Sequence, residues 1–158
     1  MDAIADRFAD RAVRSVFVYT REAHPGEIYR HHTSMEGKRE NAKALREVVG
    51  ITRQVLLDEI DGPAHKAYGQ LPNMTWILGR GGLILYKSAW TDPEDVEDSL
   101  KRALDGLEHR GAGDKLPFYS ERLSWRIRDD DKFRELLARC GPQAVSDFFD
   151  KRPKQRRA

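Results

Sequence analysis

Residues 13–19 read Val13-Arg14-Ser15-Val16-Phe17-Val18-Tyr19, and the chain then continues as Thr20-Arg21-Glu22-Ala23-His24-Pro25-Gly26. β-Branched and aromatic residues dominate the first run, and its second half is continuously apolar. This pattern is typical of a strand that is covered on both faces in an α/β sheet. His24, Pro25 and Gly26 end the pattern and predict a loop. The two runs together predict a strand that carries a polar loop at its carboxyl end.

Further elements flank this strand on both sides. Upstream, Ile4 and Phe8 lie four residues apart and predict an amphipathic helix over residues 2–10. Downstream, Ser34 is a suitable cap for the next helix, and Gly79-Arg80-Gly81-Gly82 suits a hairpin between two strands. The remaining expected elements are a helix over 35–48, a strand over 55–58, a helix over 64–68, strands over 75–78 and 83–86, and a helix over 92–108. This order predicts an α/β domain.

After residue 108 the pattern becomes purely helical. His109-Arg110-Gly111-Ala112-Gly113 predicts a hinge, and Phe133, Leu136, Leu137 and Cys140 form the apolar stripe of a helix that Gly141-Pro142 ends. A second short helix is expected over 143–149, and Asp129-Asp130-Asp131 would cap the first. We therefore expect a core over 1–108, a small helical C-terminal extension over 109–150 and a basic tail over 151–158.

The composition excludes several classes of protein. The 158 residues contain 28 Lys and Arg against 26 Asp and Glu, so the net charge of +2 gives no strong field for nucleic acid. No uncharged run approaches the roughly 18 residues of a membrane span, and the first residues do not resemble a signal peptide. The single cysteine, Cys140, excludes an intramolecular disulfide and a CxxC pair. We expect a cytoplasmic protein that binds neither nucleic acid nor membrane.

Two patches resemble the iodothyronine deiodinase family and its bacterial relatives. The first is the strand that ends at Tyr19 and the Glu22-Ala23-His24-Pro25 loop that follows it. The second is Ala67-Tyr68-Gly69-Gln70-Leu71-Pro72, followed by Trp76-Ile77-Leu78 and the glycine-rich hairpin to Tyr86-Lys87. With the matching order of elements, the resemblance covers about residues 1–107.

The resemblance implies a thioredoxin-like fold and a thiol-dependent reductive dehalogenase. In that family a selenocysteine or cysteine attacks the iodine of an aryl iodide. Tyr19, Glu22 and His24 match family positions that line the substrate pocket and relay protons, which makes Glu22 and His24 the expected catalytic residues. The nucleophile has no counterpart, because Met1 already lies inside the helix that would carry it. The stretch after about residue 108 departs from the animal family's pattern.

The same family fold would place one more strand between the strands at 13–19 and 75–78. Without it, two apolar strand edges would remain unpaired, and open apolar edges favour aggregation. We expect that the natural protein begins further upstream. The alternative is that these strands pair directly or with another chain.

The roles of the polar residues can also be interpreted without the family resemblance. Glu22 and His24 follow the carboxyl end of a strand, where α/β folds bind ligands, and a carboxylate beside an imidazole can relay protons. Both side chains could equally be structural or merely exposed. Tyr19 is a candidate for substrate binding or for the core. Trp90, beside Thr91-Asp92, is a second candidate for substrate binding and is open to the same two readings.

We predict neither a metal nor another cofactor. His31 and His32, with His24 and Glu22, suggest a cluster, but adjacent histidines in an extended segment point to opposite sides. Cys140 completes a helical stripe near a helix C-terminus, where the dipole disfavours a thiolate, so it is expected to pack as a small apolar residue.

Two functions follow from these observations, and a third, metal-dependent hydrolysis at the histidines, would require a suitable ligand geometry. The first is a deiodinase-like oxidoreductase that acts on a small molecule with a thiol reductant protein as partner, its nucleophile being absent from this chain. The second is a non-catalytic thioredoxin-like module that binds a ligand or a protein. Since loss of a covalent nucleophile can cost on the order of a million-fold in rate, we expect the chain itself to show no deiodinating or thiol–disulfide turnover.

Overall fold

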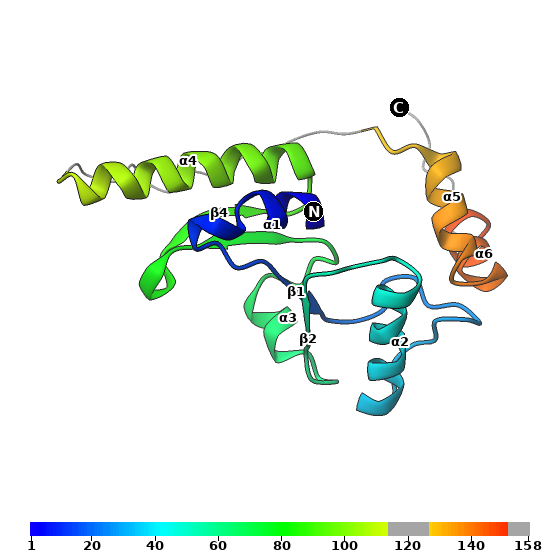
Figure 1. The fold of residues 1–158 in the computed structure, drawn as a ribbon. Coiled ribbons are helices and arrows are strands. Elements are labelled where there is room, and N and C mark those ends of the chain that lie inside the picture. The colour runs from blue at the N-terminus through cyan, green and yellow to red at the C-terminus, as the bar shows by residue number, and fades with distance from the viewer. Residues whose placement is uncertain (114–126, 152–158) are drawn as a thin grey trace. The chain divides into compact units, whose positions relative to one another are not determined.

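The computed structural model describes residues 1–113 and 127–151 (Figure 1). The first half of the chain contains α1 (Asp2–Arg7), a 3₁₀ turn η1 (Ala9–Arg11), β1 (Val16–Tyr19), α2 (Met35–Glu47), β2 (Gln54–Leu57) and α3 (Pro63–Ala67). The second half contains β3 (Thr75–Leu78), a 3₁₀ turn η2 (Arg80–Gly82), β4 (Ile84–Ser88), α4 (Pro93–Gly111), α5 (Asp130–Ala138) and α6 (Pro142–Phe149). This sequence of elements confirms the predicted α/β class.

The strands form two short sheets of two strands each. β1 pairs with β2, and β3 pairs with β4. The second pair is antiparallel, with Thr75 opposite Ser88 and Ile77 opposite Tyr86, and its register shifts between Ile77 and Leu78. The hairpin predicted through residues 79–82 is therefore confirmed, with η2 as its connection.

Side-chain caps fix the starts of three helices. The Ser34 Oγ accepts a hydrogen bond from the Gly37 N–H at 3.2 Å, and one carboxylate oxygen of Asp92 accepts the Asp95 N–H at 3.0 Å. Asp129 does the same for Lys132 at 3.0 Å, which confirms the capping role predicted for the acidic triplet. Each cap satisfies a backbone donor that the first turn of a helix leaves without an intrahelical partner.

The described chain divides into two compact units. The first unit comprises residues 1–16, 52–54 and the described part of 65–124. Its core contains the buried side chains of Ile4, Phe8 and Leu100, against which four partly buried residues pack: Met1, Val13, Ile77 and Leu104. The predicted N-terminal helix thus contributes both of its apolar residues to this core.

The second unit comprises residues 17–51, 55–64 and the described part of 125–158. Within it, α5 and α6 pack against each other as a helical hairpin (Figure 1). Several of its buried side chains are polar or charged, namely Tyr19, His32, Lys38 and Asp58. A polar interior of this kind requires hydrogen bonds, and these bonds define the site described below.

Three sequence predictions need correction. The hinge expected over 109–113 is wrong in its first part, because α4 continues to Gly111 with His109 and Arg110 in its last turn, where cations suit the helix dipole. The strand expected over 55–58 lies one residue earlier. Asp58 is outside it because its carboxylate accepts the N–H groups of Glu59 and Ala64 at the start of α3.

The third correction concerns β1, which was expected to be covered on both faces. Val16 and Val18 are 40% and 42% exposed, whereas Tyr19 is 7% exposed. A sheet of two strands covers little area, so the alternate side chains of β1 keep contact with solvent.

Some expectations fall outside what the structure describes. Trp125 and the basic tail from residue 152 onward lie outside the described residues, and the domain boundaries stay a prediction. Within residues 1–113 and 127–151, no helix combines the length and the apolar character that a membrane crossing requires.

Candidate functional site

The site begins at Tyr19, the last residue of β1. Its hydroxyl lies 2.8 Å from the Oε2 of Glu22 and 3.1 Å from the Nε2 of His32. The imidazole of His32 meets the tyrosine ring edge-on, with the ring centroids 5.2 Å apart. Tyr19 and His32 are both buried. The strand therefore places one hydroxyl between a carboxyl group and an imidazole.

Glu22 lies in the loop directly after this strand. Burial raises the pKa of its carboxyl group, although hydrogen bonds from Tyr19 and from the backbone N–H groups of His24 and Ala23 act in the opposite direction. Burial also raises the pKa of Tyr19, and the charge of Glu22 raises it further. Both groups are thus held toward their protonated forms, which are the forms that donate a proton.

Asn41 of α2 fixes the role of the imidazole. Its Nδ2 lies 3.2 Å from the Arg30 carbonyl oxygen and 3.1 Å from the Nε2 of His32. A carbonyl can only accept, so this contact orients the amide with its NH₂ group toward both partners. The Nε2 of His32 is consequently an acceptor, and its proton is on Nδ1. Burial, followed by the charges of Lys38 and His31, lowers the pKa of His32, in agreement with a neutral ring.

Counting hydrogens gives the state of the cluster. Tyr19 has one hydroxyl hydrogen, which it can donate either to Glu22 or to His32. In the structure the tyrosine hydroxyl donates to the Oε2 of Glu22. The Nε2 of His32 has one lone pair, which accepts from Asn41, so the hydroxyl oxygen of Tyr19 lies beside a ring nitrogen that already has a donor. One hydroxyl group thus lies between a carboxyl group and an imidazole, both of which can exchange protons.

The side chain of His24 contacts different residues from those that the side chain of Glu22 contacts. Its imidazole meets the rings of Phe133 and Phe148 edge-on, with centroid separations of 5.5 Å and 5.4 Å. Phe133 and Phe148 also contact each other at 4.9 Å. Cationic side chains cover this aromatic cluster: Arg128 lies over Phe133 and Phe148, and Arg134 lies 4.0 Å from the centre of Phe149.

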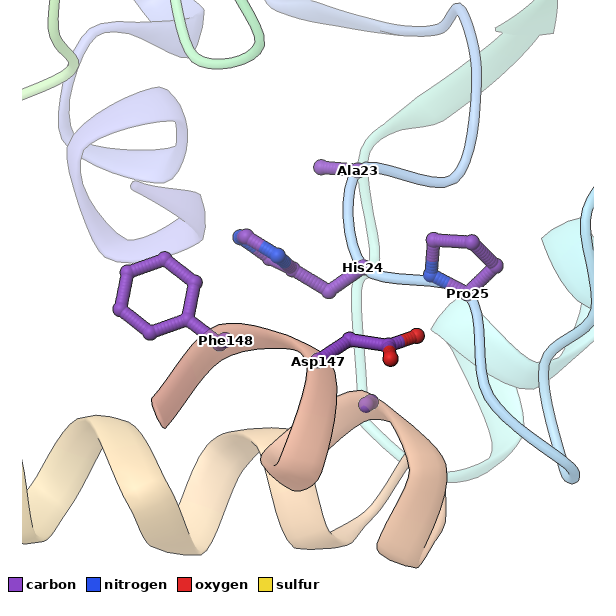
Figure 2. Close-up of a pocket in the computed structure, with 6 residues that line it drawn as sticks. Ala23, His24, Pro25, Asp147 and Phe148 are labelled. Carbon is purple, nitrogen blue, oxygen red and sulfur yellow. The ribbon is translucent and has the colours of Figure 1, made fainter. Parts of the chain in front are cut away.

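A pocket of about 180 Å³ opens beside His24, and six residues line it: Ala23, His24, Pro25, Ala144, Asp147 and Phe148. Figure 2 shows three of these residues on the loop and the ring of Phe148 and the carboxylate of Asp147 on α6. A cavity of about 150 Å³ accommodates benzene. The pocket therefore has room for one six-membered ring with a small substituent.

The α5–α6 hairpin is held on the loop by backbone contacts. The Ile28 N–H donates to the Cys140 carbonyl oxygen at 3.0 Å. The Gln143 N–H, in the first turn of α6, donates to the carboxylate of Glu27 at 3.0 Å, so Glu27 acts as a cap from 116 residues away. Gly26 allows this approach, because a Cβ at that position would lie 2.2 Å from the Cys140 carbonyl oxygen. These contacts bring Phe148 and Asp147 to the loop.

Cys140 lies near the Tyr19–Glu22 pair without acting as a reactive thiol. Burial raises the pKa of its thiol, and the negative charge of Glu22 raises it further. A thiolate is the nucleophilic form, so this environment disfavours attack by Cys140.

The sequence predicted part of this constellation. Tyr19 and Glu22 lie together as expected, whereas the side chains of Glu22 and His24 have different neighbours. Trp90 belongs to the first unit and is 57% exposed. In the described part of the chain, no three His, Cys, Asp or Glu side chains converge as a metal site would require.

Sequence reasoning missed His32 and Asn41 as partners of Tyr19, and Asp147 and Phe148 as pocket residues. His32 was weighed only as a metal ligand. Its position two residues before the cap Ser34 was an available signal, because this spacing places it beside the first turn of α2. Nothing in the sequence signals that α6 approaches the loop.

Comparison with known proteins adds no relative: no family model, no curated protein and no solved structure matches this chain.

Proposed function

We propose that this chain supplies the proton-donating and substrate-binding part of a deiodinase-like, thiol-dependent reductive dehalogenase with a thioredoxin-like core, acting in the cytoplasm. The observation that carries the proposal is the Tyr19 hydroxyl, which contacts both Glu22 and His32, together with a pocket of single-ring size whose lining begins at the next residue, Ala23. The resemblance of Tyr19, Glu22 and His24 to family positions supports it. The order of β1, α2, β2 and then β3, β4, α4 is compatible with a thioredoxin-like core.

The proposed reaction needs a proton and two thiols. A thiol that is not part of this sequence attacks the halogen of an aryl iodide, the carbon–iodine bond breaks, and a sulfenyl iodide forms. The ring carbon keeps the electron pair of that bond and takes a proton from Glu22, and the proton that the attacking thiol loses restores the Glu22 carboxyl group. A second thiol of a reductant protein then displaces iodide from sulfur, giving a disulfide and hydrogen iodide. The aryl carbon is reduced by two electrons, and two thiols are oxidised to one disulfide.

Each described group has one role in this scheme. Glu22 donates the proton, and the Tyr19 hydroxyl, which donates a hydrogen bond to Glu22, helps to return a proton to that carboxylate. His24 and Phe148 contact the ring of the substrate. General acid catalysis typically contributes about 10²- to 10⁴-fold in rate, which is the contribution assigned to Glu22.

The proton-donating half can be tested without a nucleophile. Protonation of a phenol ring at the carbon beside the hydroxyl exchanges a ring hydrogen for deuterium in D₂O. We expect the chain to accelerate this exchange in 4-methylphenol, measured by proton NMR. Glu22→Gln should lower the accelerated rate by at least about tenfold, since an amide does not donate an acidic proton.

Two controls accompany this measurement. Cys140→Ala should exchange at the parent rate, and iodide release from 4-iodophenol with dithiothreitol should stay at the level of dithiothreitol alone. Exchange at the buffer rate despite saturable binding of 4-methylphenol would overturn the proposed reaction.

That outcome would favour the second candidate, a non-catalytic module that binds a ligand or a protein. The observation that favours this candidate is the state of Cys140. It is the single cysteine of the chain, and burial and Glu22 hold its thiol protonated. A phenol that binds the pocket and loses affinity in Phe148→Ala, without exchange in the parent, would establish it.

A further inference from the structure

Lys38 is the most deeply buried large side chain of the described residues, with 1% exposure. It lies on α2, and its Nζ donates hydrogen bonds to the carbonyl oxygens of Thr20 at 2.5 Å and Glu59 at 3.4 Å. Thr20 follows β1 directly, and Glu59 lies two residues beyond β2. One ammonium group therefore links the segments that leave both strands of this sheet.

A buried ammonium is costly unless other groups compensate its charge. Burial lowers the pKa of Lys38, while the negative charges of Asp58 and Glu59 raise it. Asp58 is itself buried, and its carboxylate also accepts the backbone N–H groups of Glu59 and Ala64. Such a compensated charge in an interior is unusual for a lysine, which is almost never fully buried unless paired.

Lys38 and Asn41 lie three residues apart on α2, so they face the same side of the helix. Asn41 contacts the Nε2 of His32 directly, and the positive charge of Lys38 acts on the same ring. We propose that Lys38 is a positioning residue of the proton-donating site: its ammonium ties the start of the Glu22 loop at Thr20 to the segment after β2, on the face of α2 from which Asn41 contacts His32. The positioning role of Lys38 rests on the proposed function, whereas the titration that tests it does not.

Groups from three segments contact His32 or act on it. Tyr19 of β1 and Asn41 of α2 contact the ring, Glu22 of the loop contacts Tyr19, and the charges of His31 and Lys38 act on the ring. Asn41 carries no charge, and burial holds Glu22 and Tyr19 toward their neutral forms. His31 is exposed, where solvent screens its charge. Lys38 is therefore the buried charge that opposes protonation of His32.

The test is a pH titration of the histidine rings by ¹H–¹⁵N NMR on the whole chain. Lys38→Met removes the charge and keeps most of the volume, whereas Lys38→Arg keeps the charge and alters the shape. We expect His32 to titrate at higher pH in Lys38→Met than in the parent, and close to the parent in Lys38→Arg. His109, on α4 of the first unit, is the internal reference. An unchanged His32 midpoint in folded Lys38→Met, or equal shifts in both variants, would overturn the proposal.

The parent chain provides a second measurement that does not depend on a variant folding. Coupling between two charges is reciprocal, so the ammonium ¹⁵N resonance of Lys38 should move as His32 titrates. An ammonium resonance that stays fixed through that range rejects the proposal. The phenol exchange assay is independent of both readouts. If the chain does not accelerate phenol exchange but Lys38 and His32 are coupled, only the proposed function is rejected. If the chain accelerates exchange but Lys38 and His32 are not coupled, only the role of Lys38 is rejected.

Discussion

Two buried clusters, one in each unit, consist of different kinds of side chain. In the first unit, Ile4, Phe8 and Leu100 meet with no polar partner among them, and burial of apolar area stabilises the contact. In the second unit, Tyr19, His32 and Lys38 are as well buried, but each is held by hydrogen bonds of defined direction. Apolar packing tolerates small shifts, whereas a directed bond fixes protonation and position. The apolar cluster of the first unit therefore contributes stability, whereas the hydrogen-bonded cluster of the second unit contains groups that can take part in chemistry.

The apolar cluster of the first unit can be disrupted at Phe8. Phe8→Ala removes a ring that is 6% exposed and leaves a cavity among Ile4 and Leu100, so we expect a loss of about 3–5 kcal/mol in the free energy of unfolding. Chemical denaturation would measure it. Ile127→Ala, at a fully exposed position of the second unit, should change stability by no more than about 0.5 kcal/mol. Comparable losses in both variants would contradict the assigned core.

The docking of the α5–α6 hairpin can be broken at Gly26. In Gly26→Ala the new methyl group meets the backbone of Cys140, which cannot rotate away, so we expect a loss of about 1–3 kcal/mol. Faster hydrogen exchange of the Ile28 N–H should accompany it, because that group donates to Cys140. Gly37→Ala is the matched control, since its methyl group would meet only the Ser34 Oγ at 3.5 Å. Unchanged protection of Ile28 would reject this docking.

The polar contacts of the first unit are expected to matter less than its core. One carboxylate oxygen of Asp2 accepts hydrogen bonds from the backbone and side chain of both Thr52 and Arg53. Burial opposes the charge, but the bonds from Arg53 outweigh it and bring the pKa of Asp2 to about 2. Asp2→Asn should cost about 1–2 kcal/mol at neutral pH.

The pH dependence of this contribution has a definite sign. The pKa of Asp2 is lower in the folded chain than the ordinary 3.8, so its contribution is present above about pH 4 and is lost as the pH falls toward about 2. Acid titration of stability, with the exposed Asp6→Asn as control, would show this window. A parent and an Asp2→Asn variant that keep the same difference from pH 5 to pH 2 would contradict it.

The smallest expected effect concerns His32 in the second unit. The pKa of His32 is lowered on folding, so the unfolded chain binds more protons as the pH falls below the ordinary 6.5, and stability is lost there. His32→Gln should remove this part of the slope between pH 7.5 and pH 5, whereas His109→Gln serves as the control. A parent profile no steeper than that of His32→Gln would show that folding does not lower the pKa of His32.

The local elements were predictable because their signals are local. Ser34 and Asp129 cap helices where the sequence placed caps, and the glycines at 79–82 connect a hairpin. The carboxyl end of β1 was likewise recognisable from the apolar run that ends at Tyr19. These features depend on residues within a few positions of one another, so a local sequence pattern is enough to predict them.

The site was predictable only in part, because its remaining contacts join distant segments. Lys38 had a visible signal: with Met35, Ala42 and Leu45 it falls on one stripe of α2, which predicts burial for an otherwise charged residue. The contacts of His24 with Phe133 and Phe148 had no signal in the sequence, since more than a hundred residues separate the partners. Distances of that length depend on the packing of whole helices rather than on any local pattern.

The cap that Glu27 provides for α6 has a consequence for the order of events during synthesis. The loop that carries Glu22 leaves the ribosome more than a hundred residues before Gln143, its partner in that cap. Closing so long a loop has an entropic cost that must be met before the contact forms. The strands and α2 can therefore assemble while the loop still lacks α6, and the pocket beside His24 arises late in folding. A nascent chain halted before α5 would have the tyrosine–glutamate segment without the wall that Phe148 and Asp147 provide.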